Sequence, residues 1–216
     1  MKNISQVIKI LKIKNKEFYK PVVTQESLDR TPFRVLISCL LSLRTKDDVT
    51  ANASKRLFSV AQNPEHIVRL DTKKIEQLIY PVGFYRTKAK RIKEICKVLI
   101  NTHNSKVPES MEELLKLKGV GKKTAAITLV YGFGKANYIP VDVHVHVLSN
   151  RLGWVKTKNA DETMQKLMDV VPKRYWYDLN DLFVTYGQNI CLTRSPLCSK
   201  CPINKYCKKI NVTNSR

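Results

Sequence analysis

Apolar residues along this chain recur mainly at intervals of three and four, which is the spacing of one face of an α-helix. The clearest runs are Val35, Leu36, Cys39, Leu40 and Leu43, and then Ile92, Ile95, Val98 and Leu99. Strand-like alternation is confined to residues 141–147, Val-Asp-Val-His-Val-His-Val, which would pass for a strand if read in isolation. The pattern therefore predicts an almost entirely helical, all-α protein.

Residues typical of helix N-termini precede several of these runs. Thr31 is followed by Pro32 at the expected first helical position, where a missing amide hydrogen costs nothing. Asp71 precedes the run that ends at Tyr80, and residues 110–113, Ser-Met-Glu-Glu, have the form of a capping box. Helices are expected to begin at these three places.

The length and composition limit the classes of protein to which this chain can belong. With 216 residues, 43% of them hydrophobic, the chain can form one or two compact domains with a real core. The longest apolar run, near residues 35–43, is too short to cross a bilayer, and the lysine-rich start lacks a signal-peptide pattern. We expect a cytoplasmic monomer that has no membrane partner and associates with the nucleoid when it acts.

The charge balance points to a polyanionic partner. Lys and Arg number 39 against 18 Asp and Glu, a formal net charge of +21. The stretches 114–141 and 182–216 contain no acidic residue, and a third basic block covers residues 86–93. One such block is usually a solvated face, but three in one chain favour nucleic acid.

Four cysteines near the end of the sequence can surround one metal centre. They are Cys191, Cys198, Cys201 and Cys207, and no histidine lies among them. Their spacing leaves a [4Fe-4S] cluster and zinc both open, because an inner C-x2-C suits either. Cys39 and Cys96 lie inside apolar helical patterns and are expected to be buried small hydrophobes.

Residues 117–126, Leu-Lys-Gly-Val-Gly-Lys-Lys-Thr-Ala-Ala, predict a helix-hairpin-helix. Gly119 and Gly121 stand between a short capped helix and an apolar helix that is expected to run through Val130. Glycines let such a hairpin take unusual dihedrals and approach a ligand, so that its amides can hold a phosphate. An isolated G-x-G is more often an ordinary turn, but the surrounding lysines and the cysteines favour DNA here.

The hairpin, residues 141–144 (Val-Asp-Val-His), the four-cysteine tail and residues 41–47 together resemble the endonuclease III family of the helix-hairpin-helix DNA glycosylase superfamily. The resemblance covers nearly the whole chain. It implies a six-helix barrel domain with the hairpin over residues 26–135, and an iron-sulfur cluster domain made of residues 1–25 and 136–216. It also resolves the cysteine set in favour of a [4Fe-4S] cluster.

The activity implied by the resemblance is that of a bifunctional DNA glycosylase and AP lyase in base excision repair. Such an enzyme removes oxidised pyrimidines from damaged double-stranded DNA and cleaves the abasic site by β-elimination. Lys123 would be the nucleophile and Asp142 would stabilise the positive charge that develops on the sugar. Without the resemblance, Lys123 would be interpreted as a phosphate contact and Asp142 as a helix N-cap.

The same resemblance implies a set of DNA contacts. Arg44 and Phe84 would fill the gap left by the extruded nucleotide, with Arg44 in place of the family's usual glutamine. A core aromatic at a turn is the alternative for Phe84. The remaining contacts would come from the hairpin and the cysteine loop: Gly119, Val120, Gly121, Lys122, Arg194 and Lys200.

Two alternatives to this function stay open from the sequence. One is a mismatch-specific thymine, uracil or adenine DNA glycosylase, and the other is a non-catalytic iron-sulfur DNA-binding protein. A metal site at His144 and His146 is disfavoured, because no further ligand is placed to complete it and a helix would separate the two side chains.

Overall fold

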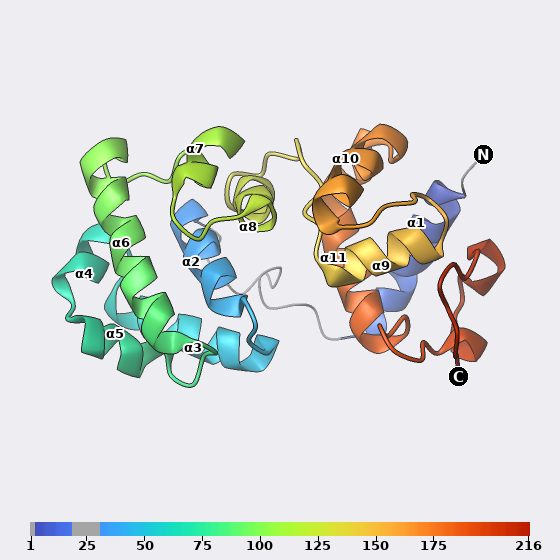
Figure 1. Cartoon of the computed structure of the whole chain (residues 1–216), viewed down its shortest axis with the longest axis horizontal. Coiled ribbons are helices and arrows are strands. Elements are labelled where there is room, and N and C mark those ends of the chain that lie inside the picture. Colours follow the sequence, from blue (N-terminus) through green and yellow to red (C-terminus); the bar gives the residue numbers. More distant parts are fainter. Residues whose placement is uncertain (1–2, 19–30) are drawn as a thin grey trace. The chain divides into compact units, whose positions relative to one another are not determined.

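The computed structural model describes residues 3–18 and 31–216, and every regular element in these ranges is a helix (Figure 1). The chain divides into two compact units, residues 22–135 and residues 1–21 together with 136–216. The domain boundary expected between residues 25 and 26 lies outside the described residues.

The unit of residues 22–135 is built around α2 (Pro32–Ser42), which packs against α3, α6 and α8. Eight of its eleven residues are buried, as expected of a helix that is apolar on nearly every side. The other helices of this unit are α3 (Asp47–Val60), α4 (Pro64–Arg69), α5 (Thr72–Ile79), α6 (Tyr85–His103), α7 (Met111–Lys116) and α8 (Lys122–Ile127).

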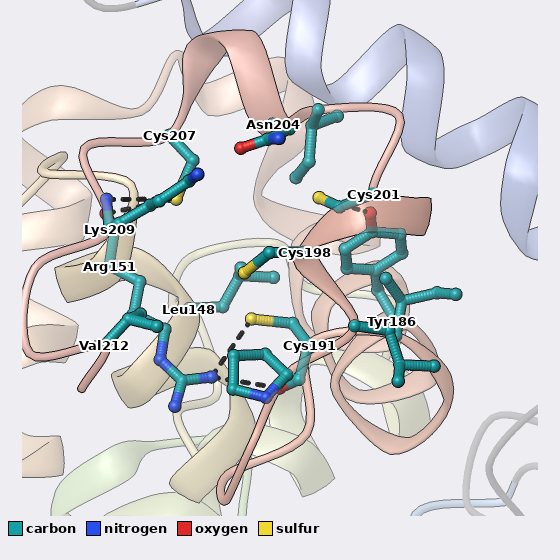
Figure 2. A pocket seen from close by; sticks show the side chains of 14 residues that line it. Leu148, Arg151, Tyr186, Cys191, Cys198, Cys201, Asn204, Cys207, Lys209 and Val212 are labelled. Atoms are coloured by element: carbon teal, nitrogen blue, oxygen red, sulfur yellow. Dashed lines mark hydrogen bonds between the residues drawn. The ribbon is translucent and has the colours of Figure 1, made fainter. Parts of the chain in front are cut away.

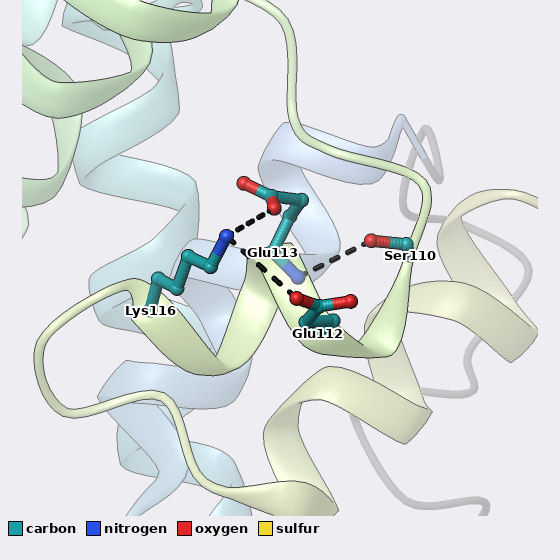
Figure 3. A network of polar contacts seen from close by, with 4 residues as sticks. All are labelled: Ser110, Glu112, Glu113 and Lys116. Atoms are coloured by element: carbon teal, nitrogen blue, oxygen red, sulfur yellow. Dashed lines mark hydrogen bonds and ion pairs between the residues drawn. The ribbon is translucent and has the colours of Figure 1, made fainter.

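The three predicted helix starts are present, although Asp71, the N-cap of α5, makes no side-chain capping bond. The Thr31 hydroxyl accepts from the Arg34 amide at 3.4 Å, and the Ser110 hydroxyl accepts from the Glu113 amide at 3.2 Å. The reciprocal half of the capping box is missing, because the Glu113 carboxylate binds Lys116 at 2.5 Å instead (Figure 3). The box therefore caps α7 from one side only.

The apolar helix predicted after the hairpin changes character halfway. α8 ends at Ile127, and Thr128–Gly132 forms a π-helical turn. The Thr128 hydroxyl donates to the Thr124 carbonyl at 2.9 Å. A Cβ on Gly132 would lie 2.8 Å from Cα of Pro32, so the turn needs glycine where it meets the start of α2.

The second unit is built around α11 (Trp176–Asn189), which packs against both α1 and α9. α1 buries Ile4, Val7, Ile8 and Leu11, and Lys12 of α1 forms an ion pair with Asp178 of α11. The remaining elements are α1 (Ile4–Lys14), α9 (Val143–Arg151), α10 (Ala160–Val170) and the short 3-10 helices η1 (Asn15–Glu17), η4 (Lys173–Tyr175), η5 (Cys198–Lys200) and η6 (Asn204–Tyr206).

Residues 143–147 are helical despite the alternating pattern of residues 141–147, because Asp142 caps a helix that begins at Val143. Among the described residues, no helix is both long enough and apolar enough to span a bilayer.

Candidate functional site

The hairpin between α7 and α8 is a tight turn in which the Val120 amide donates to the Leu117 carbonyl at 2.9 Å. Gly119 has a φ of +86°, a conformation that side chains rarely adopt. A Cβ there would also lie 2.6 Å from Nη1 of Arg91, which reaches the hairpin from α6. The positive φ therefore favours glycine at this position, whereas the flexible end of the Arg91 side chain could move aside.

Gly121 differs from Gly119, and the expectation of unusual dihedrals at both positions is wrong for it. Its φ of −96° and ψ of 176° are extended, and nothing lies within 4 Å of a Cβ built on it. Gly121 is exposed and forms the N-cap of α8 without a side-chain cap, whereas Val120 is buried beside it. The hairpin thus presents backbone to solvent at Gly121.

Lys122 and Lys123 are the first two residues of α8. Lys122 is exposed and Lys123 is partly buried, while the next residue, Thr124, lies in the core within 3.6 Å of the Cys39 sulfur. Burial raises the pKa of the Cys39 thiol, and the nearby charge of Lys123 opposes that rise. The Lys123 side chain therefore lies at the edge of the core.

Asp142 is the N-cap of α9, and its Oδ1 accepts from the Val145 amide at 2.9 Å. The preceding Pro140 is held by Asn180 of α11, whose side-chain amide donates to the Pro140 carbonyl at 3.0 Å. The N-cap interpretation of Asp142 is thus correct. A cap uses one carboxylate oxygen and fixes the side chain without excluding a further role.

His144 and His146 are each held by neighbours in their own unit. A Cβ on Gly187 would lie 2.6 Å from Nδ1 of His144, so the ring packs closely on α11. Nδ1 of His146 lies 2.7 Å from the Thr163 hydroxyl. These contacts give both rings a packing role.

Arg44 and Phe84 project from two neighbouring loops of the unit of residues 22–135. Both have left-handed backbones, with φ of 54° and 57°, and the Arg44 guanidinium lies 5.7 Å from the centre of the Phe84 ring. Phe84 is 63% exposed, which excludes the alternative of a core aromatic. The structure therefore pairs the two side chains at the surface.

The four cysteines of the C-terminal loop line one pocket, and Figure 2 shows their sulfur atoms turned toward a common space. All four are partly buried free thiols. Apolar side chains, among them Leu148, Ile190 and Ile203, line the same pocket, and the Tyr186 hydroxyl lies 3.1 Å from the Cys201 sulfur.

Arg151, which sequence reasoning missed, provides a positive charge beside these thiols. Its side chain is almost fully buried, and its Nη1 lies 3.3 Å from the Cys191 sulfur. The guanidinium also donates to the carbonyls of Leu192 at 2.8 Å and Thr193 at 2.7 Å. The sequence held one sign of this role: Arg151 stands between the apolar residues Leu148 and Leu152, on the face of the helix that is buried.

Burial raises the pKa of the free Cys191 thiol, and the hydrogen bond from Arg151 opposes that rise. Burial also raises the pKa of the free Cys207 thiol. A buried cation that meets a sulfur favours a thiolate at that position, which is the form that binds metal.

Among residues 3–18 and 31–216, no group of three or more His, Cys, Asp or Glu is arranged to hold one metal ion. The four cysteines, which line a largely apolar pocket with a buried cation beside it, are the residues that could hold an iron-sulfur cluster.

Arg194 and Lys200 are exposed on the same loop. Lys205 lies 5.0 Å above the ring of Tyr206 and is also exposed. The cysteine pocket thus lies beneath a basic surface of its own loop.

Comparison with known proteins gives consistent matches. The model of the HhH-GPD superfamily base excision DNA repair proteins matches residues 37–173. Endonuclease III of Thermotoga maritima is 46% identical over 177 residues, which cover 82% of this chain and 83% of that protein.

Two solved structures resemble the whole chain. A trapped endonuclease III-DNA covalent intermediate, described as an estranged-adenine complex, has a TM-score of 0.82 and 33% identity over 97% of each chain. A thermostable thymine-DNA glycosylase has a TM-score of 0.76 and 25% identity, covering 94% of this chain and 97% of that one.

Proposed function

The chain belongs to the endonuclease III family within the HhH-GPD superfamily of base excision DNA repair proteins, and from this premise we propose that Lys123 is its nucleophile and Asp142 the carboxylate that assists it. The protein is a DNA glycosylase with AP lyase activity, acts on oxidised pyrimidines in base excision repair, and has DNA as its partner.

The reaction assigned to Lys123 begins with attack of its amine on C1′ of the damaged nucleotide. The C1′–N bond breaks, its electrons leave with the base, and the base takes up a proton. The nitrogen then loses a proton and forms a Schiff base with C1′ as the C1′–O4′ ring bond breaks and O4′ takes up a proton. Loss of a C2′ proton next breaks the C3′–O bond, and the 3′ phosphate leaves. The partly buried position of Lys123 at the start of α8 supports this role.

Asp142 would stabilise the positive charge that develops on the sugar and help to move the proton. The bond from the Val145 amide leaves the second carboxylate oxygen for this work and restricts the side chain to one orientation. Such restriction favours catalysis because little reorganisation is needed when the charge develops.

The hairpin would grip a phosphate next to the lesion. The exposed Gly121 and the first amides of α8 offer donors that no side chain caps, and Lys122 adds a positive charge. Contacts of this kind fix the position of the duplex without reading its sequence. Arg194 and Lys200 would contribute further phosphate contacts.

Arg44 and Phe84 would occupy the space vacated when the damaged nucleotide leaves the stack. Exposed aromatic rings can enter a base step, and a guanidinium over the ring adds donors that can face the opposite base. We expect Arg44 to influence which base is preferred opposite the lesion.

Cys191, Cys198, Cys201 and Cys207 would hold the family's iron-sulfur cluster as a [4Fe-4S] centre. When bound, the cluster supplies a cross-link that orders the loop, while Arg151 offsets part of its negative charge. We assign the cluster domain to residues 1–25 and 136–216 and the six-helix barrel to residues 26–135, and we expect a monomer in the cytoplasm.

Borohydride trapping on DNA with an abasic site tests the proposal most directly. The observation behind it is the likeness to a trapped covalent complex over 97% of both chains. We expect a covalent complex with the unaltered protein and none with Lys123→Ala. Lys122→Ala is the matched control and should still be trapped; undiminished trapping in Lys123→Ala would reject the assignment.

A mismatch thymine glycosylase is the second candidate, and the likeness to a thermostable thymine-DNA glycosylase is the observation in its favour. Duplexes that carry thymine glycol, uracil opposite guanine, or thymine opposite guanine separate the two at constant salt. Faster excision from the mismatched duplexes than from thymine glycol would favour this second function.

A further inference from the structure

Lys88 lies in the first turn of α6 and reaches the end of α2. Its Nζ donates to the carbonyl oxygens of Leu41 at 2.7 Å and Leu43 at 2.6 Å. Carbonyls at a helix C-terminus have no partner within the helix, and a cation there is favourable for the helix dipole. The Lys88 ammonium therefore caps α2 from another helix.

The same ammonium connects two loops through Thr45. The Thr45 hydroxyl accepts from Lys88 at 3.2 Å and from the Gly83 amide at 3.1 Å, and donates to the Leu43 carbonyl at 3.3 Å. A hydroxyl can donate one hydrogen bond and accept two, so the Thr45 hydroxyl uses its full hydrogen-bonding capacity. A Cβ on Gly83 would lie 2.6 Å from the Arg44 carbonyl oxygen, so the two loops are also in close backbone contact.

Arg44 and Phe84 stand on these two loops, one on each. Their left-handed backbones are uncommon for residues other than glycine and persist when surrounding bonds hold them. Lys88, Thr45 and Gly83 supply such bonds within one small region.

We propose that Lys88 is a positioning residue that holds the Arg44 and Phe84 loops together so that both side chains enter DNA as one unit. The inference rests on the proposed function of Arg44 and Phe84. It gives Lys88 a role different from a phosphate contact, which is how a lysine in the basic block 86–93 would otherwise be interpreted. Burial, which lowers the pKa of Lys88 to about 8, agrees with a side chain turned inward.

Lys88→Met tests the proposal, because it keeps the length of the side chain and removes its donors. Lys90→Met is the matched control: Lys90 is exposed on the same helix, so the variant loses the same charge. The readout is the fluorescence of 2-aminopurine placed opposite an abasic site, with the full-length iron-sulfur protein at saturating concentration. Melting followed by circular dichroism shows whether each variant is folded.

We expect Lys88→Met to lower the fluorescence increase and to slow single-turnover excision about tenfold, the effect of losing roughly one charge-assisted hydrogen bond. Lys90→Met should leave both near the unaltered values. Lys88→Arg should restore part of the signal, since it can donate to the same oxygens. If Lys88→Met does not fold, Thr45→Val removes the link between the loops and keeps the lysine.

A double-mutant cycle completes the test. The effects of Arg44→Ala and Phe84→Ala on excision should be non-additive in the unaltered protein and additive in the Lys88→Met background. A full fluorescence signal and undiminished coupling in Lys88→Met would overturn the inference. If instead Arg44→Ala and Phe84→Ala, each made in the otherwise unaltered protein, leave the 2-aminopurine fluorescence unchanged, the proposed insertion of these two side chains into DNA is wrong.

Discussion

Gly119 and Gly121 need glycine for different reasons. Gly119 has a positive φ that disfavours a side chain, whereas a side chain on Gly121 would meet no other atom of the protein and could interfere only with a bound ligand. Gly119→Ala should destabilise the protein by about 1–2 kcal/mol because of its positive φ. Gly121→Ala should leave stability unchanged or raise it by up to about 1 kcal/mol. Thermal melting of the two variants measures this difference.

Binding of the same two variants to an abasic duplex gives the second half of this prediction. Gly121→Ala should weaken binding despite its normal stability, because its Cβ would stand where the hairpin backbone approaches a phosphate. Unchanged affinity in Gly121→Ala would place the phosphate elsewhere on the hairpin.

At the residue scale, sequence reasoning succeeded where a residue type admits few environments. Cys39 and Cys96 were predicted to be buried, and both side chains are fully buried. Lys88 and Arg151 were missed as structural residues because a lysine in a basic run and an arginine on a helix are usually solvated. Their partners are carbonyl oxygens and a sulfur from distant segments, which no local pattern reveals.

At the element scale, α1 depends on a partner far along the chain. Leu11 is fully buried in the packing of α1, whereas Ile13 of the same helix is 62% exposed. Leu11→Ala should therefore cost about 2–5 kcal/mol of stability, and Ile13→Ala less than about 0.5 kcal/mol. Denaturant unfolding of the two variants tests this, and equal losses would contradict the packing of α1 on α11.

Helix starts were predictable because capping side chains act locally, as at Thr31 and Ser110. The end of α8 could not be predicted in this way, because the π-helical turn brings Gly132 against Pro32, which lies 100 positions earlier in the sequence. The residues 141–147 show the opposite case: the local cap at Asp142 outweighs an alternation that is typical of strands.

At the scale of the whole molecule, a net charge of +21 makes DNA binding steeply dependent on salt. Replacing Arg194 or Lys200 by Gln should each lower the slope of log affinity against log salt by about 1 if each contacts one phosphate. Removing the iron should weaken binding through the same basic loop before it slows excision at saturating DNA.

Affinity and single-turnover rate, measured before and after chelation of the iron, check this last prediction. Cys39→Ala is the matched control, because it removes a thiol outside the loop and should retain the iron. A protein that binds the duplex equally well without iron would show that the loop keeps its shape unaided.

The unit that contains the cysteines is discontinuous, since its first helix precedes residues 22–135 and the rest follows them. During translation α1 is made before the hairpin-bearing unit and α11 after it, so these two helices can pack together only once that unit has been made. The four cysteines follow residues 22–135 in the sequence, so the pocket that they line can form only after the hairpin-bearing unit has been translated.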